Sequence, residues 1–145
     1  MKKVCFLTLG CKVNQYETQA MRESLLKRGF EETENGESDL VVINTCTVTQ
    51  EADRENQYWI RRLRRDNPHA KIVVTGCWVE RNRKEIEALS GVDLILSNRE
   101  KEGLADRLAL GCGTPKVQNR REYDSLRISS FRGYARAFLK IQDGC

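Results

Sequence analysis

The sequence predicts an α/β protein built on a doubly wound parallel sheet, and three observations lead to this fold class. Short apolar segments rich in Val, Ile and Leu alternate with longer segments whose apolar residues recur at helical spacing. The short segments are apolar almost throughout, which is typical of strands buried on both faces of a parallel sheet. The resulting order, βαβαβαβα, predicts right-handed crossovers with helices on both sides of the sheet.

Four strands are expected, each followed by a helix. The strands are residues 4–9, 40–43, 72–75 and 94–96. The first helix is expected to begin at Asn14, whose side chain can cap it, and Glu17 would complete a capping-box-like pattern three residues later. This helix would present Met21, Leu25 and Leu26 inward and end at Gly29.

The other three helices also have recognisable ends. The second follows Thr47 or Thr49 and ends before Pro68, because the residue before a proline disfavours helical backbone. The third is expected over residues 80–89 and the fourth over residues 99–110. Apolar residues along one side of each helix would pack on the sheet.

The chain divides into three parts. Residues 1–112 hold the whole βα pattern and are long enough for a domain with its own core. Residues 113–133 are mostly polar and predict a linker. Residues 134–145 contain an extended apolar segment, so we expect them to be the start of a second domain that this chain truncates.

Charge and hydropathy favour a cytoplasmic protein. The net charge of +4 arises in residues 115–145, which hold seven basic and three acidic side chains, while residues 1–114 are neutral. This basic tail could face phosphates, but so small an excess favours a solvated linker. The apolar segment after Lys3 is too short for a secretory signal, and no segment approaches the ~20 apolar residues that span a bilayer.

Cysteine is unusually frequent, with six residues in 145. In a reducing compartment, clustered cysteines more often bind metal or carry redox chemistry than form disulfides. None of the six forms a C-x-x-C pair. Any shared site must therefore be assembled by the fold.

Three cysteines stand at corresponding places in successive βα units. Cys11, Cys46 and Cys77 follow the first three expected strands and are 35 and 31 residues apart. All strands of a parallel sheet end on the same side, where open α/β folds bind their ligands. In a flavodoxin-like (Rossmann-like) order, 2-1-3-4, the second and third strands flank the first. With strands ~4.8 Å apart, the three thiols would fall within about 10 Å of one another.

The donor set favours an iron–sulfur cluster. Each cysteine precedes an expected helix N-terminus, whose partial positive charge favours thiolate. Three thiolates without a fourth ligand suit such a cluster better than structural zinc, which prefers four protein ligands. The single histidine, His69, precedes the third strand and is expected at the opposite end of the sheet.

The competing interpretation of any one cysteine is a small core residue. We interpret Cys5, inside the first strand, in this way, and Cys112, in a glycine-rich segment, as incidental. The spacing of Cys145 indicates nothing by itself.

Several segments resemble known motifs. They are LGCKVNQYE at residues 9–17, NTCTV at 44–48, GCWVE at 76–80 and KIQDGC at 140–145. In this order they resemble the three cysteine motifs and the radical-SAM segment of the radical-SAM methylthiotransferases. The resemblance covers essentially the whole chain.

This resemblance implies a set of cofactors. Cys11, Cys46 and Cys77 would hold an auxiliary [4Fe–4S] cluster that carries the sulfur. Cys145 would be the first ligand of a second [4Fe–4S] cluster, on a C-x₃-C-x₂-C motif, that cleaves S-adenosylmethionine in the complete enzyme. The fragment alone is expected to bind one cluster and to be inactive, and the resemblance assigns no other catalytic residue and no sulfur donor.

Four further residues match positions beside the first cluster. Asn14, Asn44 and Thr45 would either donate hydrogen bonds that tune the cluster or cap helices. Trp78, next to Cys77, would shield the cluster from water or form a wall that faces the substrate.

The resemblance also implies a substrate. The residues that follow Cys11 are most similar to the branch that converts N6-threonylcarbamoyladenosine in tRNA, next to the anticodon, to its 2-methylthio form. The alternatives within the family are N6-isopentenyladenosine in tRNA and an aspartate of a ribosomal protein. Alternatives of another kind are a zinc or redox site and a flavodoxin-like binding module with incidental cysteines. The binding module is weakened because no glycine-rich phosphate loop is present.

One helix combines basic and aromatic residues. Arg61, Arg62, Arg64 and Arg65 lie near Tyr58 and Trp59. They could contact RNA phosphates and stack on a base. Nearby acidic residues favour the other interpretation, a solvated helix face with Trp59 packed on the sheet.

Overall fold

The computed structural model describes residues 2–34, 37–47, 49–109 and 129. Cys112 and Cys145 lie outside the described residues. So do the expected start of a second domain and, apart from Ser129, the expected linker. The domain boundaries expected from the sequence therefore stay predictions.

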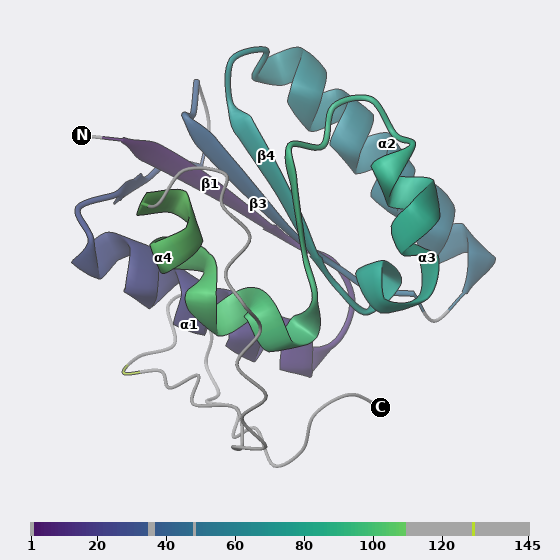
Figure 1. Ribbon diagram of the computed structural model, residues 1–145, viewed down its shortest axis with the longest axis horizontal. Helices are drawn as coiled ribbons and strands as arrows, with labels where there is room; N and C mark the ends of the chain where they lie inside the picture. Colours follow the sequence, from purple (N-terminus) through teal and green to yellow (C-terminus); the bar gives the residue numbers. More distant parts are fainter. Residues whose placement is uncertain (1, 35–36, 48, 110–128, 130–145) are drawn as a thin grey trace.

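Five parallel strands form one sheet in the order β2-β1-β3-β4-β5 (Figure 1). The strands are β1 (Lys3–Thr8), β2 (Glu31–Glu32), β3 (Leu40–Thr45), β4 (Lys71–Gly76) and β5 (Leu94–Leu96). The helices are α1 (Lys12–Lys27), α2 (Gln50–Asp66), α3 (Cys77–Glu87) and α4 (Leu104–Ala109), with the 3-10 helix η1 (Asn98–Gly103) before α4. This arrangement confirms the predicted α/β, flavodoxin-like fold class.

One expectation about neighbouring strands is wrong. The second strand along the chain, at the edge of the order 2-1-3-4-5, is the two-residue strand Glu31–Glu32. Two glutamates have low strand propensity, so the sequence does not indicate this strand. The strand that ends before Cys46 is therefore β3, and it lies between β1 and β4. Hence Cys46, rather than Cys11, follows the middle strand of the three.

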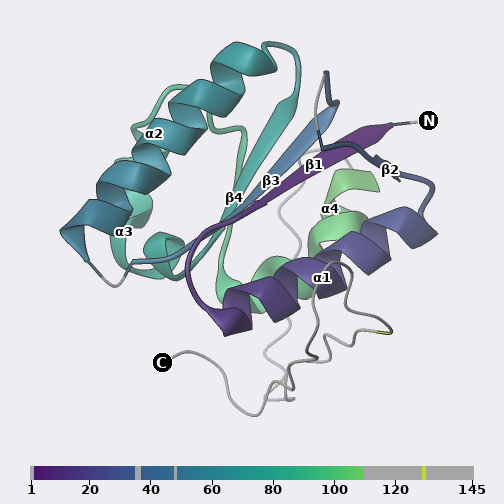
Figure 2. The same cartoon turned by 180° about the vertical axis from the view of Figure 1, so that it is seen from behind.

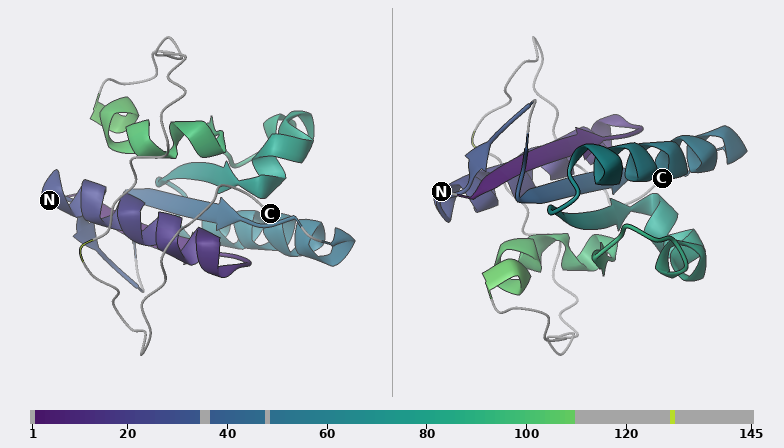
Figure 3. Two further views of the ribbon diagram at one scale, coloured as in Figure 1. Left: turned by 90° about the horizontal axis from the view of Figure 1, so that it is seen from below. Right: turned by 90° about the horizontal axis from the view of Figure 1, so that it is seen from above.

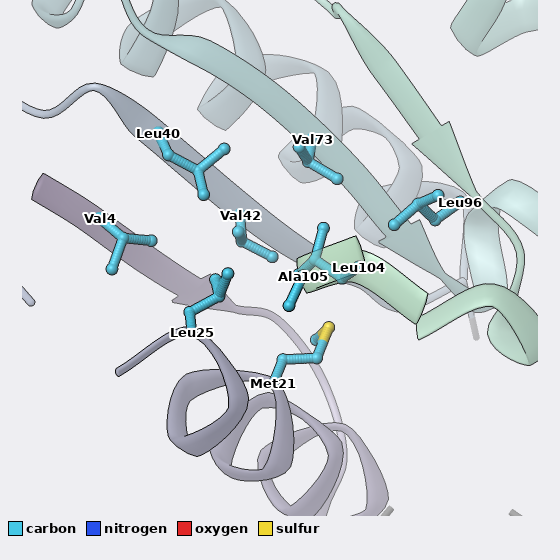
Figure 4. Close-up of a cluster of buried hydrophobic side chains, with 9 residues drawn as sticks. All are labelled: Val4, Met21, Leu25, Leu40, Val42, Val73, Leu96, Leu104 and Ala105. Atoms are coloured by element: carbon cyan, nitrogen blue, oxygen red, sulfur yellow. The ribbon is translucent and has the colours of Figure 1, made fainter. Parts of the chain in front are cut away.

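Helices cover both faces of the sheet. Figures 2 and 3 show α1 and α4 on one face and α2 and α3 on the other. Because side chains of a strand alternate between faces, each face has its own core. The core on the α1–α4 side, drawn in Figure 4, consists of Val4, Met21, Leu25, Leu40, Val42, Val73, Leu96, Leu104 and Ala105. The core under α2 and α3 consists of Val41, Ile43, Ile60, Ala70, Ile72, Val74, Trp78, Val79 and Ile86.

Two helices begin earlier than expected, and both begin within a candidate cysteine motif. α1 begins at Lys12 rather than Asn14, with Cys11 as its N-cap residue. α3 begins at Cys77 itself rather than at residue 80. In the part of the chain that the structure describes, no helix is long and apolar enough to cross a membrane.

Candidate metal centre at the carboxyl edge of the sheet

The strands β1, β3 and β4 end in step at the carboxyl edge of the sheet. Thr8, Asn44 and Thr75 are successive register partners across these strands. A candidate cysteine follows each of them within three residues. We refer to Cys11, Cys46 and Cys77 as the edge cysteines. The fold thus delivers all three to the same side of the sheet.

Two glycines allow the neighbouring segments to pack closely against the Cys46 segment. Gly10 has φ 98°, and a Cβ there would lie 2.2 Å from Cys46 Cβ and 2.7 Å from its Sγ. Gly76 has φ 111°, and a Cβ there would lie 2.2 Å from Thr45 O. Each glycine directly precedes one of the other two edge cysteines. Only glycine allows both the positive φ and so close an approach of the backbone.

Asn14 connects two of the cysteine segments from within. It is 1% exposed, and its Nδ2 donates to Leu9 O at 2.8 Å and to Thr45 O at 2.9 Å. The expectation that Asn14 caps the first helix is wrong, because α1 starts before it. Both amide protons are used on carbonyl groups, so neither is left for a cluster sulfur.

Asn44 and Thr45 also connect elements and do not cap helices. Asn44 Nδ2 donates to Asn14 O at 3.0 Å and to Thr18 Oγ1 at 3.1 Å, which joins β3 to α1. Thr45 Oγ1 donates to Thr75 O at 2.6 Å, which joins β3 to β4. Both side chains are fully buried. They hold the edge in place beneath the cysteines.

Asn56 is a site residue that the sequence analysis missed. It lies in α2, is 1% exposed, and donates from Nδ2 to Cys46 O at 2.8 Å. The sequence signal that could have found it is its position four residues before the inward-facing Ile60, on the same side of the helix. The Cys46 backbone is therefore held from α2 as well as from the strands.

The edge cysteines differ in exposure. Cys46 is buried, Cys77 is half-buried and Cys11 is exposed. Within the described residues, no three Cys, His, Asp or Glu side chains stand close enough together to hold a metal ion. A common centre therefore requires at least one of the edge cysteine side chains to move toward the others.

Three other residues have clear placements. Trp78 is fully buried in the core under α3 and packs the first turn of that helix onto the sheet. The expectation that it forms a wall facing the substrate is therefore wrong. Cys5 packs on the same core, as predicted, and burial together with Glu32 raises the pKa of its thiol. His69 is exposed in the loop before β4, at the opposite end of the sheet.

A buried polar layer lies under the carboxyl edge, between the sheet and α1. Asn44 Oδ1, Thr75 Oγ1 and Asn98 Oδ1 are buried without a hydrogen-bond partner among the described residues. Glu17 of α1 forms a buried ion pair with Lys101 of η1. Unpartnered buried polar atoms of this kind mark a place that a water molecule or a ligand completes.

The start of η1 is fixed by a capping box. Ser97 N donates to Glu100 Oε2 at 2.7 Å, and Arg107 also pairs with Glu100. Burial raises the pKa of Glu100, but the hydrogen bonds from Ser97 and the charge of Arg107 outweigh it and lower the pKa overall. This cap holds the segment that carries Lys101.

The residues at the edge fit an iron–sulfur cluster by three criteria. Cysteine thiolates are the ligands that such clusters use. Cys11 is the N-cap of α1 and Cys77 the first residue of α3, so both cysteines stand at helix N-termini, where anionic ligands are favoured. The Gly10 backbone packs directly against Cys46, which brings the segments of two edge cysteines together.

The fold and this edge define a class: flavodoxin-like α/β domains with three thiols at the carboxyl ends of neighbouring strands. The model of the family described as "Uncharacterized protein family UPF0004" matches residues 3–97. The chain belongs to this family. The match covers β1 to β5 and all three edge cysteines.

The similar curated proteins are methylthiotransferases, which confirms the resemblance predicted from the motifs. The chain is 38% identical over 154 residues to "Threonylcarbamoyladenosine tRNA methylthiotransferase MtaB" of Bacillus subtilis, covering 100% of this chain and 34% of the relative. It is 40% identical over 146 residues to the protein of the same name from Chlamydia pneumoniae, covering 99% and 32%. It is 29% identical over 150 residues to "Ribosomal protein uS12 methylthiotransferase RimO" of Chlamydia felis, covering 99% and 32%. The chain thus spans about a third of the length of these relatives.

Proposed function

We propose that this chain is the cluster-binding N-terminal domain of a cytoplasmic tRNA methylthiotransferase. The complete enzyme would convert N6-threonylcarbamoyladenosine near the anticodon to its 2-methylthio form. Support for this substrate comes from the relatives with 38% and 40% identity, whose names specify threonylcarbamoyladenosine in tRNA. The relative that acts on a ribosomal protein is less similar, at 29% identity.

The observation that carries the proposal is the packing of two glycine–cysteine segments onto a third cysteine. Gly10 contacts Cys46, and Gly76 contacts Thr45, the residue before Cys46. A fold that needed only small core residues at these positions would not need positive-φ glycines beside two of them. The packing supports a shared role for the three thiols.

Each residue of the edge then has a role. Cys11, Cys46 and Cys77 would hold the auxiliary [4Fe–4S] cluster. When bound by three cysteines, such a cluster supplies one open iron for a sulfur-carrying ligand. Asn14 and Asn56 would hold the cysteine segments in place through their carbonyl groups. In the complete enzyme, Cys145 would be the first ligand of the cluster that works with S-adenosylmethionine.

Anaerobic reconstitution with iron and sulfide tests the cluster. We expect a broad brown absorbance and about four irons per chain. Cys46→Ser should lose most of this iron, whereas the matched control Cys5→Ser should keep it. Equal iron in both variants, or a colourless protein that takes up one zinc ion, would contradict the proposal. The second outcome would favour a zinc site, and no metal uptake would favour a binding module.

The substrate is tested in cells. Deleting the gene should remove the 2-methylthio form of N6-threonylcarbamoyladenosine from tRNA hydrolysates, as measured by nucleoside mass spectrometry. Loss of the 2-methylthio form of N6-isopentenyladenosine, or a mass decrease of a ribosomal protein, would assign the enzyme to one of the other branches.

A further inference from the structure

The outer face of α2 carries a row of basic residues that the proposed cluster site does not use. Arg54, Tyr58, Arg61 and Arg65 recur at the i, i+4, i+7 and i+11 positions, so they share one side of the helix. All four are exposed. The buried residues Asn56 and Ile60 lie on the other side, toward the sheet. We call this row, with Arg62 beside it, the α2 stripe.

The charge of the stripe is only partly neutralised. Asp66, at the end of α2, pairs with Arg62 at 3.7 Å and with Arg65 at 3.6 Å. Among the described residues, no carboxylate lies within ion-pair distance of Arg54 or Arg61. Two other acidic residues of α2 accept hydrogen bonds from uncharged side chains: Asp53 from Thr47 Oγ1, and Glu55 from Trp59 Nε1. Glu51 lies in the first turn of the helix.

The exposed aromatic ring of Tyr58 lies between Arg54 and Arg61 on the stripe. Tyr58 is 55% exposed, the highest value for a large hydrophobic side chain in the described part of the chain. Its ring meets Trp59 edge to face at 5.5 Å between centroids. Trp59 in turn lies under the Arg62 guanidinium, 5.2 Å from it, and is outside the two cores. The expectation that Trp59 packs on the sheet as core is therefore wrong.

The side chains of Arg54, Gln57, Tyr58, Arg61, Arg62 and Arg65, all of α2, line a shallow, open hollow of about 470 Å³ on the outer side of the helix. Arg62 Nη1 donates to Tyr58 Oη at 3.3 Å, which holds the hydroxyl end of the ring while the side chain stays 55% exposed. Guanidinium groups around an aromatic face suit phosphates next to an unstacked base.

The stripe also begins near the proposed cluster site. Arg54 lies about one turn into α2, and Cys46 precedes that helix by four residues. At 1.5 Å per residue, the stripe then extends roughly 16 Å away from the carboxyl edge. A polyanion lying along α2 (Figure 2) would reach the edge where the cysteines emerge.

We propose that the α2 stripe is an RNA-binding surface that holds backbone phosphates with Arg54, Arg61 and Arg65 and stacks a base on Tyr58. This inference rests on the proposed function, because it names the part of the domain that contacts the RNA substrate. The alternative occupant, an acidic protein surface, would use the same arginines but would not need the exposed ring.

Fluorescence anisotropy with a labelled, unmodified RNA hairpin of the tRNA anticodon arm tests the surface. The double variant Arg54→Gln with Arg61→Gln should weaken binding about tenfold, and the salt dependence of log K should fall by about 0.7 for each lost contact. Tyr58→Ala should weaken binding by about five- to 100-fold through lost stacking. The matched control, Arg28→Gln with Arg83→Gln, removes the same charge from exposed ion pairs elsewhere and should stay within about twofold of the parent chain.

Three outcomes would overturn the proposal: no binding of the hairpin by the parent chain, equal losses in the stripe and control variants, or displacement of the RNA by polyglutamate at matched charge. The last outcome would favour an acidic protein partner. Iron content after reconstitution separates this failure from failure of the proposed function. If the stripe variants bind as much iron as the parent chain and Cys46→Ser does not, the cluster proposal is supported. The RNA-binding proposal can then fail on its own.

Discussion

The two ends of the sheet are built differently, although the same strands form both. At the amino end, polar groups satisfy one another. Arg64 donates to Ala70 O at 2.8 Å and to Gly91 O at 3.0 Å, and it pairs with Asp93. Ser38 Oγ donates to Asn67 Oδ1 at 2.9 Å. This end is closed by the protein's own hydrogen bonds.

At the carboxyl end, the hydrogen bonding is incomplete. All three buried side-chain atoms that lack a partner among the described residues belong to Asn44, Thr75 and Asn98, which lie at or just beyond strand ends on this side. The edge cysteines and the two tightly packed glycines are also here. The difference teaches that the protein's own polar groups complete the amino end, whereas they leave the carboxyl end, the end at which open α/β folds bind ligands, incomplete among the described residues.

The largest expected effect concerns the buried ion pair of the carboxyl end. Lys101→Met removes the cation of the buried ion pair with Glu17, so we expect the free energy of unfolding to fall by about 3–5 kcal/mol in urea titrations. At the amino end, Asp93→Asn breaks a half-exposed pair and should cost about 0–1 kcal/mol. The double variant Glu17→Leu with Lys101→Met should recover most of the loss. Equal losses for Lys101→Met and Asp93→Asn would remove the contrast between the ends.

A smaller effect is expected from the glycine contacts. Gly76→Ala combines positive-φ strain with a clash against Thr45 backbone, and should cost about 2–4 kcal/mol. Gly29 also has a positive φ, 86°, but nothing lies within 4 Å of a Cβ there, so Gly29→Ala should cost only about 1 kcal/mol. Denaturant midpoints measure both losses, and iron content after reconstitution should fall only for Gly76→Ala. If both variants lose the same unfolding free energy, the clash with the Thr45 backbone would contribute nothing beyond the positive-φ strain.

The smallest effect distinguishes two threonines on neighbouring strands. Thr45 Oγ1 donates to Thr75 O at 2.6 Å, so Thr45→Val should cost about 1 kcal/mol. Thr75 Oγ1 is buried without a partner in the described structure, so Thr75→Val should be neutral or stabilise by up to about 1 kcal/mol. Thermal unfolding of the metal-free chain measures both. A clear loss with Thr75→Val would mean that its hydroxyl is already bonded, and the carboxyl end would then be as complete as the amino end.

Much of the fold was predictable because it depends on local pattern. The runs of Val and Ile in β3 and β4 predicted buried parallel strands, and the structure places their alternate residues in two cores. β2 was missed because Glu31 and Glu32 have no apolar pattern and their pairing is set by β1. That missed strand is also the reason why the neighbours of the first strand were predicted wrongly.

The candidate site was predictable in its ligands but not in its support. Spacing and the resemblance indicated the three edge cysteines, because each follows a strand end. Asn14, Asn44 and Thr45 were recognised as important, but their partners lie on other elements, at sequence separations of about 30 residues. The hydrogen bond from Asn56 to the Cys46 carbonyl also joins different elements, at a sequence separation of 10 residues.

By itself, the sequence determined four of the five described strands, the helices, the fold class, and the delivery of three thiols to one edge, since these follow from periodicity and from the common direction of parallel strands. Only the tertiary structure decided which strand lies in the middle, which polar groups lack partners among the described residues, and which side chains hold the cysteine segments in place. Those properties depend on contacts between residues far apart in the chain. Local sequence pattern does not encode them.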